Sequence, residues 1–166
     1  SAAYLLASTE GGLQCRLSVE SIIGVECTGF MHERWFQPIQ GTANPCGPDL
    51  RHDNAYLALT NAATGKPESQ FQAAVPPNWR LVHDASAQML DRSRDLQVAL
   101  YWARSGIQLQ GLAFLPSGMQ LLQGLMESFW DQLHPELDPD DPEPYARANV
   151  LASLGTEDGL IGDVRR

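Results

Sequence analysis

The spacing of apolar residues predicts helices along most of the chain after residue 36. Apolar side chains recur there at intervals of three and four, which places them on one face of an α-helix. Residues that begin or end helices punctuate the pattern: Asp53 and Asn78 can cap a helix start, and Gly65 and Gly111 can end one. We therefore expect helices over residues 53–65, 78–93, 96–111, 112–133, 145–154 and 160–164.

The helix expected over residues 96–111 is apolar almost all the way round. Leu96, Leu100 and Ile107 lie on one side, and Val98 and Trp102 lie on the other. A helix of this kind is buried in the middle of a bundle or covered by a partner. Since loops are short and no convincing strand pattern follows residue 36, we expect an all-α fold, a compact multi-helix bundle of about five or six helices.

The first 35 residues show no clear pattern. Residues 17–25 are apolar and partly β-branched, which fits one strand or a short helix, and Gly24 and Gly29 interrupt them. We therefore divide the chain into an irregular N-terminal segment, residues 1–35, and a helical domain, residues 36–166. The helix ending near Leu133 also carries the pair Phe129–Trp130, whose side chains point about 100° apart, so one of them is expected to face outward or toward a second element.

Charge narrows the classes of function. The chain has 20 acidic and 11 basic residues, a formal net charge of -9 and a pI near 4.7. Nucleic acid and anionic membranes both need a basic surface, so neither is an expected partner. No apolar run approaches the roughly 20 residues of a membrane span. The three cysteines, at positions 15, 27 and 46, are odd in number and form no CxxC pair, which favours a reducing cytoplasm over a disulfide framework.

Turn-forming residues precede the first helix. Pro45, Gly47 and Pro48, followed by Asp49 and Leu50, predict an ordered loop rather than a helix or strand. A second non-helical point is expected at the boundary between the second and third helices, where Arg94, Asp95 and Leu96 follow Ser93. The arginine there is expected to pair with a carboxylate or with exposed carbonyl oxygens and to hold helices together.

An acidic, proline-rich corner follows the fourth helix and carries the most reactive residue types. Pro135 is expected to stop that helix. His134, Asp138, Asp140 and Asp141 lie within eight positions, and carboxylates bind hard cations. A calcium loop counted from Asp138 would need glycine at its sixth position and glutamate at its twelfth, but glutamate and asparagine stand there. A solvated structural corner is therefore the preferred interpretation, and a metal site the alternative.

No other catalytic or cofactor motif is apparent. The chain has neither a GxGxxG nor a Gly-Lys-Ser arrangement for phosphate. Its Ser-Gly pairs, at 105–106 and 117–118, stand in helical or turn contexts instead of on a strand-to-helix elbow. We therefore expect no cofactor and no catalytic residue.

Three stretches, taken in order, resemble the N-terminal domain of the ImpA/TssA family of type VI secretion system proteins. They are Pro45–Asp53, Ser93–Trp102 and Phe129–Asp141, the last followed by Arg147–Leu154. The resemblance covers about residues 36–166, and the first 35 residues have no clear counterpart. It implies a non-enzymatic, cytoplasmic assembly protein that contacts baseplate, membrane-complex and tube or sheath components. It also implies that the chain is a fragment of a longer protein, which assembles into rings through a C-terminal region.

The residues and the resemblance together predict a docking domain. We expect the loop and the acidic corner to form the partner surface, with Trp130, His134, Asp138, Asp140 and Asp141 as its candidate contacts. Two other classes stay open. One is a small helical metal-dependent hydrolase centred on His134 and the aspartates, and the other is an architectural domain that self-associates through its apolar third helix.

Overall fold

Six α-helices and three short 3₁₀ helices form the described part of the chain. The structure is a computed structural model, and it describes residues 33–66, 70, 73–137, 145–157 and 159–165. The elements in order are η1 (Glu33–Phe36), α1 (Asn54–Thr64), α2 (Trp79–Arg92), α3 (Leu96–Gln110), η2 (Leu112–Phe114), α4 (Leu115–Phe129), α5 (Tyr145–Ala152), η3 (Ser153–Gly155) and α6 (Leu160–Arg165). The expected all-α class is confirmed.

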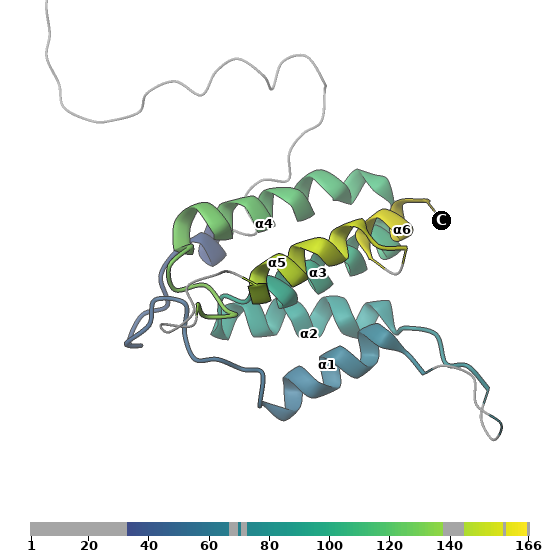
Figure 1. Cartoon of the computed structure of the whole chain (residues 1–166), viewed down its shortest axis with the longest axis horizontal. Coiled ribbons are helices and arrows are strands. Elements are labelled where there is room, and N and C mark those ends of the chain that lie inside the picture. Colours follow the sequence, from purple (N-terminus) through teal and green to yellow (C-terminus); the bar gives the residue numbers. More distant parts are fainter. Residues whose placement is uncertain (1–32, 67–69, 71–72, 138–144, 158, 166) are drawn as a thin grey trace, which may run out of the picture.

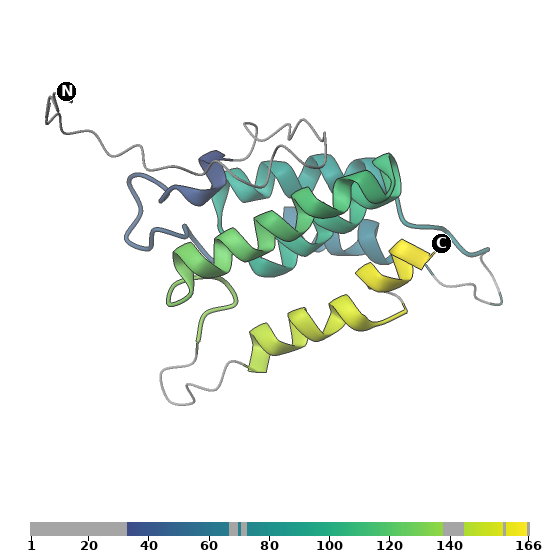
Figure 2. The same ribbon diagram turned by 90° about the horizontal axis from the view of Figure 1, so that it is seen from above.

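Helix α3 lies at the centre of the bundle. It packs between α2 and α4, while α5 and α6 cover it from a further side and α1 packs on α2 (Figures 1 and 2). Val98 and Trp102, on the side of α3 opposite Leu96, are as fully buried as Leu96 itself. Because elements of the same copy cover both sides, the idea that α3 is a self-association surface is wrong. The other interpretation of its pattern, burial in a bundle, is confirmed.

Helices α1 and α2 begin at the capping residues that the sequence predicted. Asp53 accepts a hydrogen bond from Ala55 N at 2.9 Å, and Asn78 accepts one from Leu81 N at 3.2 Å. Each satisfies a backbone donor that the first turn of a helix leaves unpaired. Gly65 ends α1 with a φ of 68°, a left-handed conformation that favours glycine.

The fourth helix is shorter than expected. It ends at Phe129 instead of near Leu133, so Pro135 does not stop it. Leu133 is nevertheless fully buried, because a turn after the helix directs its side chain into the core. The apolar spacing thus predicted the burial of Leu133 correctly but not its secondary structure. Carbonyl oxygens after Phe129 bond to an arginine of α5, as described below.

The packed unit includes residues before position 36. The Trp35 side chain is 1% exposed, and its ring meets that of Trp102 edge to face at 5.3 Å. Its Nε1 donates to Asp91 Oδ1 at 2.7 Å. The domain therefore starts no later than Glu33, while the rest of the segment 1–35 lies outside the described residues. No helix in the described ranges is long and apolar enough to cross a membrane.

Candidate functional site: the corner surface

The loop at residues 45–50 lies directly on the end of α2. Asn44 shapes it by accepting from Cys46 N at 2.8 Å through its side chain and from Gly47 N at 2.8 Å through its carbonyl. Gly47 has a φ of 78°, and a Cβ built there would lie 2.4 Å from the Arg92 carbonyl oxygen. Only glycine permits both this backbone conformation and this close approach.

Arg94 fastens the loop and the upstream segment to the α2–α3 boundary. Its backbone N donates to Cys46 O at 2.7 Å. Its guanidinium donates to the carbonyls of Leu90, of Arg34 at 3.0 Å and of Gln37 at 2.9 Å. Of the two partners the sequence allowed for it, carbonyl oxygens are the ones found. Within the described residues it makes no ion pair, and it is Arg92 that pairs with a carboxylate, that of Asp53 at 2.8 Å.

Asp95 caps α3. Its Oδ1 accepts from Gln97 N at 2.7 Å and from Val98 N at 3.1 Å. The residue is only 2% exposed, and burial raises the pKa of its carboxyl to about 6 in spite of these bonds. Asp95 therefore orients the start of the central helix, and Leu96, the first residue of that helix, is fully buried.

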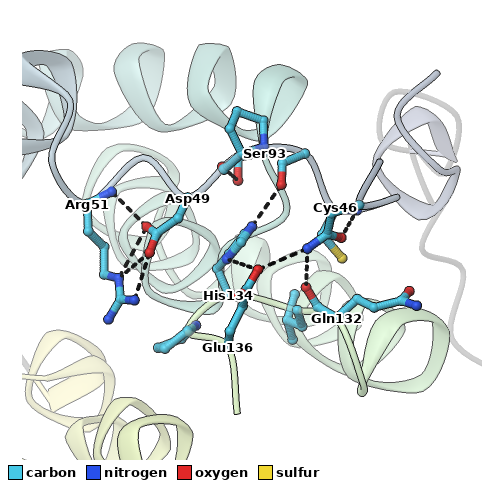
Figure 3. A network of polar contacts seen from close by, with 12 residues as sticks. Cys46, Asp49, Arg51, Ser93, Gln132, His134 and Glu136 are labelled. Carbon is cyan, nitrogen blue, oxygen red and sulfur yellow. Dashed lines mark hydrogen bonds and ion pairs between the residues drawn. The ribbon is translucent and has the colours of Figure 1, made fainter. Parts of the chain in front are cut away.

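His134 is a structural link and not a surface residue. The ring Nε2 donates to Gly47 O at 3.0 Å, and the backbone pairs with Arg94 O and Leu96 N. The other ring nitrogen, Nδ1, lies 3.7 Å from Glu136 Oε1, beyond hydrogen-bond distance. His134 is 1% exposed, so the expectation that it contacts a partner is wrong. Its ring instead holds the loop against the corner (Figure 3).

Arg147 of α5 holds the corner from the other side. Its guanidinium donates to Pro135 O at 2.8 Å and to the carbonyls of Trp130 and Leu133. The residue is 1% exposed, although arginine is rarely buried without partners. Sequence reasoning did not single it out. The available signal was its place three positions before Val150, on the buried face of a helix.

Six exposed residues border this network, and we call them the corner surface: Pro48, Asp49, Trp130, Asp131, Gln132 and Glu136. Trp130 is 40% exposed while its neighbour Phe129 is 6% exposed, so of the two outcomes expected for this pair, an outward-facing member is the one found. The Trp130 ring lies 4.9 Å from the Arg147 guanidinium, a cation–π contact. Glu136 accepts from Asn44 Nδ2 at 3.1 Å. The expected contacts Asp138, Asp140 and Asp141 lie outside the described residues.

The described residues of the corner offer little for catalysis. Nowhere in the ranges the structure describes do three or more His, Cys, Asp or Glu side chains gather so that they could hold a metal ion. The Cys46 thiol is fully buried, and burial raises its pKa to about 11. A thiol with this pKa stays protonated near neutral pH and is a poor nucleophile. In contrast, the Arg51 guanidinium bonds to the exposed Asp49 carboxylate and lowers its pKa, so that group stays charged on the surface.

Comparison with known proteins identifies the family of this chain. The family model described as "ImpA, N-terminal, type VI secretion system" matches residues 36–156. The type VI secretion system component TssA1 of Pseudomonas aeruginosa is 40% identical over 119 residues, which are 69% of this chain and 35% of the relative. The chain thus spans about a third of that relative's length.

A solved structure also matches. It is the N-terminal domain, including the conserved ImpA_N region, of the TssA component of the type VI secretion system from Burkholderia cenocepacia. The TM-score is 0.60 at 28% identity, and the match covers 74% of this chain and 45% of the other. With the family model covering well over half of its residues, the chain belongs to the ImpA N-terminal family of the type VI secretion system.

Proposed function

We propose that this domain is a non-enzymatic docking module of a TssA-like protein, and that it acts in the cytoplasm during assembly of the baseplate and the tube–sheath tail. Its partners are other secretion components: baseplate, membrane-complex, tube or sheath proteins. Nucleic acid, direct membrane insertion and a cofactor have no part in the proposal. The full-length protein is homo-oligomeric through a C-terminal region.

The observation that carries the proposal is an exposed tryptophan on a rigid, non-helical platform. The ring of Trp130 is held over Arg147, whose other bonds fix the backbone beneath it. Tryptophan is among the residues that most often dominate binding energy at interfaces, and a side chain already fixed in place loses little entropy on binding. A docking role uses both properties, whereas turnover needs neither.

Charge on the platform indicates the kind of partner surface. Asp49, Asp131 and Glu136 are exposed on the same corner surface as Trp130, and Arg51 is already paired with Asp49. A complementary partner presents basic groups around an apolar contact, since such charges mainly set association rate and specificity. Asp138, Asp140 and Asp141, which follow Glu136 in sequence, are proposed to extend this acidic surface.

A pull-down from a lysate that contains the secretion apparatus tests the proposal, with the chain and the full-length protein as parallel baits. Trp130→Ala is expected to weaken capture of a secretion component about 30-fold, the usual effect of removing a dominant interface residue. Simultaneous alanine substitution of Asp138, Asp140 and Asp141 is expected to weaken capture without unfolding the domain. Leu57→Ala, which removes a 52% exposed side chain of α1, serves as the matched control.

Equal capture by all three variants and the parent would overturn the surface assignment. The non-enzymatic part is tested separately by metal analysis of the purified chain and by melting with calcium, magnesium or zinc. A bound ion, together with conversion of a compound that depends on His134, would favour the hydrolase alternative. Circular dichroism of each variant shows whether a loss of capture is only a loss of folding.

A further inference from the structure

A pocket of about 590 Å³ lies away from the corner surface, between the end of α1, the outer side of α3 and the segment that joins η3 to α6. This volume is typical of small-molecule sites. Ala63 and Leu100 give it an apolar floor, and Gln97, Tyr101 and Arg104 of α3 line one wall. Of the ten described residues that line the pocket, two are cations and none is a carboxylate, in a chain where acidic residues outnumber basic ones by 20 to 11.

The lining residues have donors to spare. Arg104 uses its Nε to bond Asp163 Oδ2 at 2.6 Å, and its two Nη groups have no partner in the described part of the chain. The side-chain donors of Lys66, Gln97 and Tyr101 likewise bond to none of the described residues. Unused donors around an apolar floor favour a ligand that brings acceptors and an apolar portion.

Arg104 is held in position before any ligand arrives. Both carboxylate oxygens of Asp163 are occupied, one by Arg104 and the other by Gln108 Nε2 at 2.8 Å. The Arg104 guanidinium also lies 5.4 Å from the ring of Trp79. Lys66 is fixed through its backbone, which exchanges hydrogen bonds of 2.8 and 2.9 Å with Val75. Asp163 balances the charge of Arg104, and Lys66 adds a second cation to the described lining.

We propose that this pocket binds a single carboxylate attached to a short apolar body. The carboxylate lies between the Nη groups of Arg104 and the ammonium of Lys66, and the apolar part rests on Leu100 and Ala63. The end of a guanidinium matches the two oxygens of a carboxylate. The carboxylate comes either from a free organic acid or from an acidic side chain of a partner. The proposal is independent of the corner surface.

Titration of the ¹⁵N-labelled chain, followed by NMR, tests this directly. Three probes are used: hexanoate, its neutral counterpart hexanamide, and a capped Leu-Glu-Leu tripeptide. Hexanoate or the tripeptide is expected to shift the amides of Gln97, Tyr101 and Arg104, while hexanamide leaves them in place. Binding of hexanoate as tightly as the tripeptide assigns the site to free organic acids. Tenfold tighter binding of the tripeptide assigns it to a partner's side chain.

Two substitutions and a control complete the test. Lys66→Gln keeps the backbone bonds with Val75 and is expected to raise the Kd of the bound probe about fivefold, as for one exposed ion pair. Arg104→Gln is expected to raise it about tenfold or more. Arg80→Gln, which removes an exposed arginine outside the pocket, leaves the Kd unchanged. Equal shifts with hexanoate and hexanamide, no shift with either carboxylate, or an unchanged Kd in Lys66→Gln would each overturn the proposal.

Discussion

Replacing Asp95 with asparagine should make the domain's stability less dependent on pH. The folded protein holds this carboxyl 2% exposed, and its pKa rises from an ordinary value of 3.8 to about 6 through burial. Between these values the folded state binds more protons than the unfolded state, so stability falls as pH rises through the window and is constant above it. Asparagine has the same capping oxygen for Gln97 N and Val98 N but does not titrate.

The magnitude follows from the same two pKa values. A pKa difference of one corresponds to about 1.4 kcal/mol of free energy. Keeping Asp95 ionised in the folded state therefore costs about 3 kcal/mol above pH 6. About 1 kcal/mol of this is already present near pH 4.5, because the unfolded carboxyl is largely ionised there. The free energy of unfolding of Asp95→Asn, minus that of the parent, should therefore grow by about 2 kcal/mol between about pH 4.5 and pH 7.

Urea unfolding of both proteins across this pH range, followed by circular dichroism, measures the difference. Other titrating groups are common to the two proteins and cancel. Asp95→Ala is the control: it should show the same pH trend, displaced by about 1–2 kcal/mol at every pH because two bonds to the start of α3 are lost. A difference between Asp95→Asn and the parent that stays flat, or that shrinks toward neutral pH, would refute the burial argument.

Two further predictions concern the corner. Gly47→Ala should destabilise the domain by about 3 kcal/mol or more, because its Cβ would clash with the backbone and its φ is left-handed. Gly41 is the control: it has a similar φ of 81° but nothing within 4 Å of an added Cβ, so Gly41→Ala should cost only about 1 kcal/mol. Equal losses of unfolding free energy would contradict the clash. Arg147→Lys should cost about 2–4 kcal/mol, because a compact ammonium cannot reach three separate carbonyls. Its tryptophan fluorescence should also differ from that of the parent, because the contact between residue 147 and the Trp130 ring changes. A variant as stable as the parent would disprove the role of the three carbonyl bonds.

Signals that act within a few residues were readable in the sequence. The starts of α1 and α2 follow from Asp53 and Asn78, because an N-cap bonds to backbone donors only two or three positions away. Burial of α3 follows from its own all-round apolar surface. The all-α class and the family resemblance rest on such local patterns and their order.

Tertiary structure alone decided which side chains the corner exposes. His134 looks like a reactive surface group in sequence, yet its ring bonds a glycine carbonyl 87 positions away. Arg147 sets the turn after α4 from 12 to 17 positions downstream, so no local rule gives the end of that helix. Likewise, Lys66 and Arg104 line one pocket only because α1 and α3 are packed within one bundle. Capping and periodicity fix how each helix forms, whereas these contacts depend on how the helices are placed in space.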